Sequence, residues 1–172
     1  MSAMPVNLFY IAYSDATQLA MPSGYQLLDN IDSAKNDWRE YWPIRNFLQG
    51  HELAEDQWYG FFSPRFQEKT GLSAEDVRRF VADCAQDVDV VTFSPQPDMG
   101  AFFLNVFEQE ELFQAGFVEA SERFFSHIGL ECNLQSLIMD SRQVVFSNYF
   151  VARPEFWRRW LEINERRFAI CE

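Results

Sequence analysis

The sequence predicts an α/β fold, in which helices pack on a predominantly parallel or mixed β-sheet. Short runs rich in aromatic and β-branched residues alternate along the chain with segments whose apolar residues recur every three or four positions, and this alternation favours such a sheet. The chain has 172 residues, enough for one hydrophobic core and too few for two domains of ordinary size. It contains no internal repeat and no linker-like segment. We therefore expect residues 1–172 to form a single α/β domain.

Five segments have the composition of β-strands, because each is short and largely apolar. They are residues 8–13, 24–30, 58–62, 88–93 and 144–151. The first is apolar throughout, which is typical of a strand covered on both faces. In sheets of this kind, ligands bind beyond the carboxyl ends of the strands. Polar residues that follow these segments are therefore the first candidates for a functional site.

The clearest helix is expected after Ser73, whose side chain can cap it. Val77, Phe80 and Val81 then follow at helical spacing and mark one face of the helix as core. Another helical segment, residues 108–128, is expected to break at Gly116 and to stop at Gly129.

Two further helices are expected next to prolines. Asp37 and Glu40 have capping-box spacing and predict a helix over residues 37–48. Pro43 either kinks this helix or starts a second one, because an interior proline removes a backbone hydrogen bond. Pro154 suits the first position of a closing helix.

Composition excludes several classes of function. Twenty-six acidic against 14 basic residues give a formal charge of −12, which argues against a nucleic acid or an anionic membrane surface as partner. No apolar run is long enough to cross a membrane. The three cysteines are odd in number and far apart, so they predict neither a disulfide framework nor a zinc site. We expect a protein of a reducing compartment, the cytoplasm.

The common catalytic and metal motifs are absent. The chain has no glycine-rich phosphate loop, no Gly-x-Ser-x-Gly element and no histidines at metal-ligand spacing. Asp87 and Asp89 form an acidic pair, but they precede an apolar strand and are expected at the edge of the sheet away from the ligand. The sequence therefore predicts no metal ligands and no certain cofactor, and a divalent metal is doubtful.

The most informative segment lies between residues 59 and 73. It places Ser63, Arg65 and Lys69 just beyond an expected strand, in a chain otherwise short of bases. Guanidinium and ammonium groups beside a helix start at Ser73 are groups that a diphosphate requires. The alternative is a surface loop with two solvated bases.

Three other polar residues likewise have either a functional or a purely structural interpretation. Asp15 follows the first strand and either accepts a hydrogen bond from a nucleobase or ribose, or is a turn residue. Glu111, with its acidic neighbours, is either a general base or an acid at a helix start. Asn148 lies within an expected strand, and a buried amide there is either a hydrogen-bonding hub of the core or points into a site.

Four segments together resemble small bacterial glycosyltransferase-like proteins of polysaccharide gene clusters, which look like compact relatives of GT-A nucleotide-diphosphosugar transferases. They are the opening strand, residues 40–44 (EYWPI), residues 59–72 (YGFFSPRF followed by KTGL) and residues 147–157 (SNYFVARPEFW). The resemblance implies a three-layer, GT-A-like fold that binds a nucleotide-sugar and transfers the sugar to an acceptor.

The resemblance also implies roles for individual residues. Asp15 would lie near the nucleoside, Ser63 and Arg65 would take the place where such enzymes carry a metal-binding Asp-x-Asp, and Asn148 and Tyr149 would face the sugar or the acceptor. No acidic pair follows residues 58–62, and Arg65 and Lys69 could substitute for a metal cation in neutralising the leaving diphosphate.

Two other functions stay open. One is a non-catalytic binding or scaffold protein of the same fold, since no catalytic triad and no acidic pair is present. The other is a homo-oligomer that associates through surplus aromatic residues, Trp38, Tyr41, Trp42 and Trp58.

Overall fold

The computed structural model describes residues 4–84, 88–94, 101–140 and 143–172. The chain divides into two compact units. The first comprises the residues up to Phe93 together with Asn148–Asn164, and the second comprises Ser94–Ser147 with Glu165–Glu172. Asp87 of the expected acidic pair and Pro95 lie outside the described residues.

The first unit contains a five-stranded sheet in the order β2-β1-β3-β5-β4. The strands are β1 (Val6–Ala12), β2 (Gln26–Asp29), β3 (Trp58–Phe62), β4 (Val90–Thr92) and β5 (Phe150–Ala152). β1 is parallel to β2 and β3, whereas β5 is antiparallel to both β3 and β4. The predicted mixed α/β sheet with flanking helices is therefore confirmed.

The centre of the sheet is tightly packed around β3, whose five residues are all buried. Gly60 pairs with Leu8 of β1 and with Val151 of β5. A β-carbon at Gly60 would lie 2.8 Å from the Val151 side chain and 3.3 Å from that of Leu8. Only a residue without a side chain lets these neighbours meet at this position.

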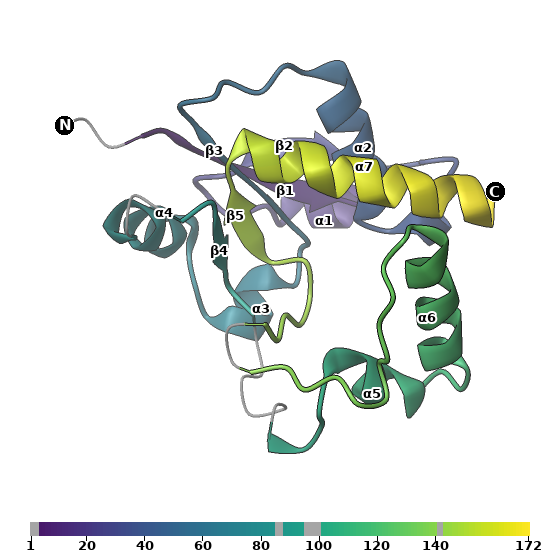
Figure 1. Ribbon diagram of the computed structural model, residues 1–172. Helices are drawn as coiled ribbons and strands as arrows, with labels where there is room; N and C mark the ends of the chain where they lie inside the picture. Colours follow the sequence, from purple (N-terminus) through teal and green to yellow (C-terminus); the bar gives the residue numbers. More distant parts are fainter. Residues whose placement is uncertain (1–3, 85–87, 95–100, 141–142) are drawn as a thin grey trace. The chain divides into compact units, whose positions relative to one another are not determined.

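Helices cover both faces of this sheet (Figure 1). On one face, α3 (Phe66–Thr70) and α4 (Ala74–Asp83) pack on β3 and β5 through Phe66 and Val77. On the other face, α2 (Tyr41–Gly50) and the start of α7 (Pro154–Cys171) contribute Ile44 and Trp157. The sheet therefore has a separate apolar cluster on each side.

The predicted cap of α4 is confirmed, and Pro43 lies at a position where a helix tolerates proline. The Ser73 side chain and the Asp76 carboxylate form the expected capping box at α4. Pro43 lies in the first turn of α2, where its missing N–H is not needed.

The capping box predicted at Asp37 and Glu40 is wrong. A short 3₁₀ helix (η1, Asn36–Trp38) precedes α2, and the Glu40 side chain makes no cap bond. The short helix α1 (Asp15–Leu19), which Ser14 caps, was not expected from the sequence.

The second unit is built on α5 (Val106–Glu111) and α6 (Phe117–His127). Gly116 and Gly129 both have positive φ, so the helix breaks at the predicted positions. The buried Asn105 amide donates to the carbonyls of Leu134 and Leu137 at 2.8 Å each. Within the described residues, no helix is long and apolar enough to cross a membrane.

Two expectations about aromatic and apolar segments need correction. The strand expected over residues 144–151 is reduced to Phe150–Ala152. Tyr41 and Trp58 are buried in the core rather than surplus, whereas Trp38 and Trp42 are half-buried. Tyr41 and Trp58 therefore cannot provide an exposed interface.

Candidate functional site

Polar side chains gather where the parallel strands end. Tyr13, Asn30 and Ser63 directly follow β1, β2 and β3. Tyr149 directly precedes β5, which runs in the opposite direction and therefore begins at the same edge. The topology thus brings four residues from distant parts of the sequence to the carboxyl edge of the sheet.

Ser63 and Tyr149 form a buried contact at this edge. Their hydroxyl oxygens lie 3.0 Å apart, and the residues are 7% and 3% exposed. The Tyr149 ring packs edge-on against Phe66, with centroids 5.1 Å apart. The Lys69 ammonium lies 5.7 Å from the centre of the same ring. Three residues that the sequence singled out are therefore brought together.

Two buried donors at the same edge have no hydrogen-bond partner within the described part of the chain. They are the Tyr13 hydroxyl and the side-chain amide nitrogen of Asn30, a residue that is only 5% exposed. The Asn30 N–H donates to the Ala12 carbonyl at 2.9 Å, which continues the β1–β2 register by one residue. Tyr13 and Asn30 are therefore neighbours, with side chains on the same face of the sheet. A buried donor without a partner calls for an explanation, and a bound ligand is one.

Burial keeps the hydroxyls of Tyr13 and Tyr149 protonated. Burial raises the pKa of Tyr13 well above its ordinary value, and the Glu40 carboxylate adds to the rise while Arg39 opposes it. Burial likewise raises the pKa of Tyr149, which the Ser63 hydrogen bond lowers and Glu40 raises further. At neutral pH both hydroxyls can therefore donate to an acceptor of a ligand.

We call Tyr13, Asn30, Ser63, Lys69 and Tyr149 the carboxyl-edge cluster. Sequence reasoning missed Tyr13 and Asn30 because each stands at the end of a strand and carries no motif. Glu40 was also missed as a site residue, although it starts the helix that leads back from this edge. The signal that could have found Tyr13 and Asn30 is their position directly after two parallel strands.

Three further residues that the sequence singled out, Arg65, Asp15 and Asn148, are exposed. Arg65 is exposed, and its guanidinium pairs with Glu68 at 3.2 Å. Asp15 is exposed at the start of α1, two residues after Tyr13. The expectation that Asn148 is buried within a strand is wrong, because it is exposed and precedes β5 by two residues.

Glu111 is engaged by backbone groups in the second unit. Its two carboxylate oxygens accept hydrogen bonds of 2.7 Å from the N–H groups of Gly116 and Val118. These bonds hold the pKa of the Glu111 carboxyl below its usual range. The carboxylate therefore caps the start of α6 and is poorly suited to accept a proton.

The described residues contain no group of three or more His, Cys, Asp or Glu side chains that could hold a metal ion. The cations Arg39, Arg65 and Lys69 lie near Tyr13 or Tyr149 at the carboxyl edge, where they can compensate the negative charge of a ligand.

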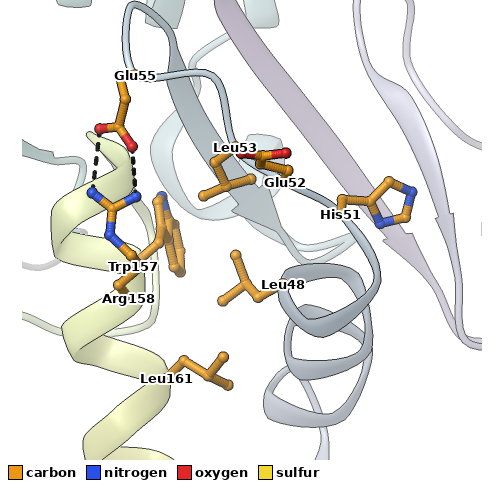
Figure 2. A pocket seen from close by; sticks show the side chains of 8 residues that line it. All are labelled: Leu48, His51, Glu52, Leu53, Glu55, Trp157, Arg158 and Leu161. Carbon is orange, nitrogen blue, oxygen red and sulfur yellow. Dashed lines mark hydrogen bonds and ion pairs between the residues drawn. The ribbon is translucent and has the colours of Figure 1, made fainter.

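A pocket lies at the opposite edge of the first unit, between the end of α2, the segment before β3 and the start of α7 (Figure 2). Its volume is about 310 Å³. Its apolar lining consists of Leu48, Leu53, Trp157 and Leu161, and its polar lining consists of His51, Glu52, Glu55 and Arg158. We call it the amino-edge pocket; it contains none of the site residues predicted from the sequence.

Comparison with protein-family models, with curated proteins and with solved structures found no match for this chain.

Proposed function

We propose that the carboxyl-edge cluster binds a nucleotide-diphosphosugar and that the protein transfers the sugar to an acceptor, as a glycosyltransferase-like enzyme. The observation that carries the proposal is the pair of buried, unpartnered donors of Tyr13 and Asn30 beside the Ser63–Tyr149 contact. A ligand rich in acceptor oxygens would satisfy those donors, and a nucleotide-sugar is such a ligand.

The diphosphate would lie toward α3. Lys69 carries its positive charge next to Tyr149, and the ion pair of Arg65 at the surface is with an exposed carboxylate, that of Glu68. An exposed ion pair is weak, so the Arg65 guanidinium can exchange Glu68 for a phosphate, to which it binds in bidentate fashion. The two cations and the Ser63 hydroxyl would together stabilise the charge of the leaving diphosphate.

The nucleoside would lie toward β1 and β2. Tyr13 and Asn30 supply donors to carbonyl or hydroxyl oxygens, and the exposed Asp15 carboxylate supplies an acceptor for ribose hydroxyls. Asn148 and Tyr149, on the β5 side, would then face the sugar or its acceptor. In this arrangement each residue of the carboxyl-edge cluster would contact one part of the nucleotide-sugar.

The transfer step requires a base that takes the proton of the acceptor hydroxyl while the bond from the sugar to the diphosphate breaks. Of the two candidates from the sequence, Glu111 is engaged by backbone N–H groups. Asp15 is therefore the better candidate, and Glu40 joins it because its charge acts on both Tyr13 and Tyr149. What supports a GT-A-like fold is the mixed sheet with helices on both faces and the polar cluster at its carboxyl edge.

Calorimetric titration with UDP-, GDP- and dTDP-sugars, with and without manganese, tests the binding. We expect saturable heat with at least one donor and about a tenfold loss of affinity in Lys69→Ala, since one charge-assisted contact is worth about 1.5–3 kcal/mol. Arg159→Ala, which removes an exposed cation of α7, should leave the affinity unchanged. Absence of heat with every donor would refute the proposal.

A non-catalytic binding protein of the same fold is the second candidate. It is favoured by the engagement of Glu111 and by the lack of an acidic metal cluster within the described residues. The two functions differ in one result: a binding protein gives heat but releases no nucleoside diphosphate, whereas a transferase releases it and loses this activity in Asp15→Asn.

A further inference from the structure

We infer that the amino-edge pocket is a second binding site, for a small organic cation with an apolar body such as an aryl- or alkylammonium. The pocket shares no residue with the carboxyl-edge cluster. The inference therefore stands whether or not a nucleotide-sugar binds at the other edge.

The apolar side of the pocket is firmly built. Trp157 is only 1% exposed, and its indole N–H donates to the Tyr59 carbonyl at 3.0 Å. This bond fixes the orientation of the ring within the core of the first unit. Leu48 and Leu53 are half-buried and pack against the same apolar cluster. A ligand ring therefore meets a preformed surface rather than mobile side chains.

The size of the pocket limits the ligand. An apolar cavity of about 150 Å³ admits a benzene ring, and the amino-edge pocket has about 310 Å³. It can therefore hold one ring with a short chain, at the lower end of the range for ligand sites.

The charges that line the pocket favour a cation. Glu55 and Arg158 neutralise each other, because two hydrogen bonds of 2.8 and 3.2 Å join the carboxylate to the guanidinium (Figure 2). Within the described residues, the Glu52 carboxylate has neither an ion pair nor a hydrogen bond. One negative charge thus remains uncompensated at the pocket, in a chain whose formal charge is −12.

His51 lies at the rim of the pocket and is held by its own helix. Its Nδ1 atom lies 2.9 Å from the Phe47 carbonyl oxygen, and its ring stacks on Phe47 with centroids 4.3 Å apart. Because a carbonyl can only accept, Nδ1 donates in this contact, and the ring points away from the apolar lining of the pocket (Figure 2). An ammonium group has three hydrogens to donate, and the Glu52 carboxylate complements it in charge and in hydrogen bonding.

Titration of the whole chain with 2-phenylethylamine, followed by NMR at the indole N–H of Trp157, tests the inference. The uncharged 2-phenylethanol and the anionic 3-phenylpropanoate serve as matched probes. We expect a saturable shift with a dissociation constant of roughly 1–10 mM for the amine, a value typical of a ligand with nine non-hydrogen atoms. The alcohol should bind about threefold more weakly, and the anion more weakly still.

Two variants test separately whether binding depends on the negative charge of Glu52 and on the open volume of the pocket. Glu52→Gln should weaken binding of the amine about threefold, whereas Glu75→Gln, an exposed charge on α4, should have no effect. Leu161→Trp should fill the pocket and abolish the shift. The inference is overturned if the three probes bind equally, if Trp157 does not respond up to about 20 mM amine, or if Glu52→Gln binds like the wild type.

Discussion

At the carboxyl edge, individual hydrogen-bonding groups affect both the stability of the fold and the proposed binding of a ligand. A buried donor without a partner destabilises a folded protein by about 1–3 kcal/mol. The described residues of the first unit hold three such donors, the hydroxyls of Tyr13 and Tyr25 and the Asn30 amide nitrogen. Tyr13 and Asn30 lie at the carboxyl edge, where their retention supports the proposal that a ligand binds there.

Tyr13→Phe keeps the ring and removes the unpartnered hydroxyl. We expect this variant to raise the free energy of unfolding by about 1 kcal/mol, measured by urea denaturation. Tyr59→Phe is the matched control, because the Tyr59 hydroxyl accepts a hydrogen bond of 2.9 Å from the Ala54 N–H. The same chemical change there should lower the free energy of unfolding by a similar amount. If both variants lose stability, the Tyr13 hydroxyl has a partner after all.

Gly60→Ala tests the packing at the centre of the sheet. The added methyl group would lie 2.8 Å from the Val151 side chain, and overpacking of a core costs about 1–3 kcal/mol. Gly50→Ala, at the end of α2, meets no atom within 4 Å and should be neutral or slightly stabilising. Thermal denaturation compares the two; equal melting temperatures would contradict the register of β1, β3 and β5.

At the scale of elements, a helix matters for stability only as far as it packs. Ser14 and Ser73 both form capping boxes, at α1 and α4 respectively. α4 buries Ala74, Val77 and Val81, whereas no residue of α1 is buried. The same cap should therefore contribute differently to global unfolding.

Ser73→Ala should lower the free energy of unfolding by about 1 kcal/mol, the usual contribution of a helix cap. Ser14→Ala should change it much less, because the five-residue helix α1 can unfold locally. Chemical denaturation measures both. An equal loss in the two variants would show that α1 is as firmly integrated as α4.

The cap of α4 also predicts a pH dependence. Hydrogen bonds from Ser73 lower the pKa of the Asp76 carboxyl below its ordinary value of 3.8. Since the lowered pKa belongs to the folded state, the carboxylate contributes stability above pH 3.8, and this contribution is lost as the pH falls through the folded-state pKa. Asp76→Asn should flatten the dependence of stability on pH in this acidic range. An unchanged profile would contradict the contribution of the cap.

Most of the elements could be predicted from the sequence, because each leaves a local signal. The aromatic run of β3 and the capped, periodic segment of α4 depend only on neighbouring residues. Residues 144–151 carry the same apolar signal, yet only Phe150–Ala152 pair, since pairing depends on β3 and β4. α3 was not expected because a five-residue helix shows less than two turns of periodicity.

Only part of the candidate site could be predicted from the sequence. Ser63 and Lys69 stand in a conspicuous basic segment, so sequence reasoning found them. Tyr13 and Asn30 are ordinary residues in their local context and become significant only when β1 and β2 lie side by side. That pairing is a long-range property, which a pattern along one segment does not contain.

At the scale of the whole molecule, charge repulsion is the dominant electrostatic feature. A formal charge of −12 on 172 residues destabilises the compact state through self-repulsion. Raising the NaCl concentration from about 20 to 200 mM shortens the screening length from roughly 20 to 7 Å. We expect the melting temperature to rise with salt over this range. A decrease would mean that attractive ion pairs, such as that of Glu55 and Arg158, outweigh the repulsion.

The same net charge shapes ligand binding. An acidic chain repels nucleotides at long range, so the proposed nucleotide-sugar would have to be held by short-range contacts at the carboxyl edge. In the proposed site, Arg65 and Lys69 would provide such contacts locally, and the rest of the specificity would come from the buried hydroxyl and amide groups.

The most direct test of a nucleotide-sugar site is calorimetry with UDP-, GDP- and dTDP-sugars on the wild type and on Tyr13→Phe. We expect one donor to bind the wild type and to bind Tyr13→Phe at least about fivefold more weakly, the effect of one lost hydrogen bond, although we expect the variant to be the more stable protein. Equal affinity of the two proteins for that donor, or no binding to either, would contradict this expectation.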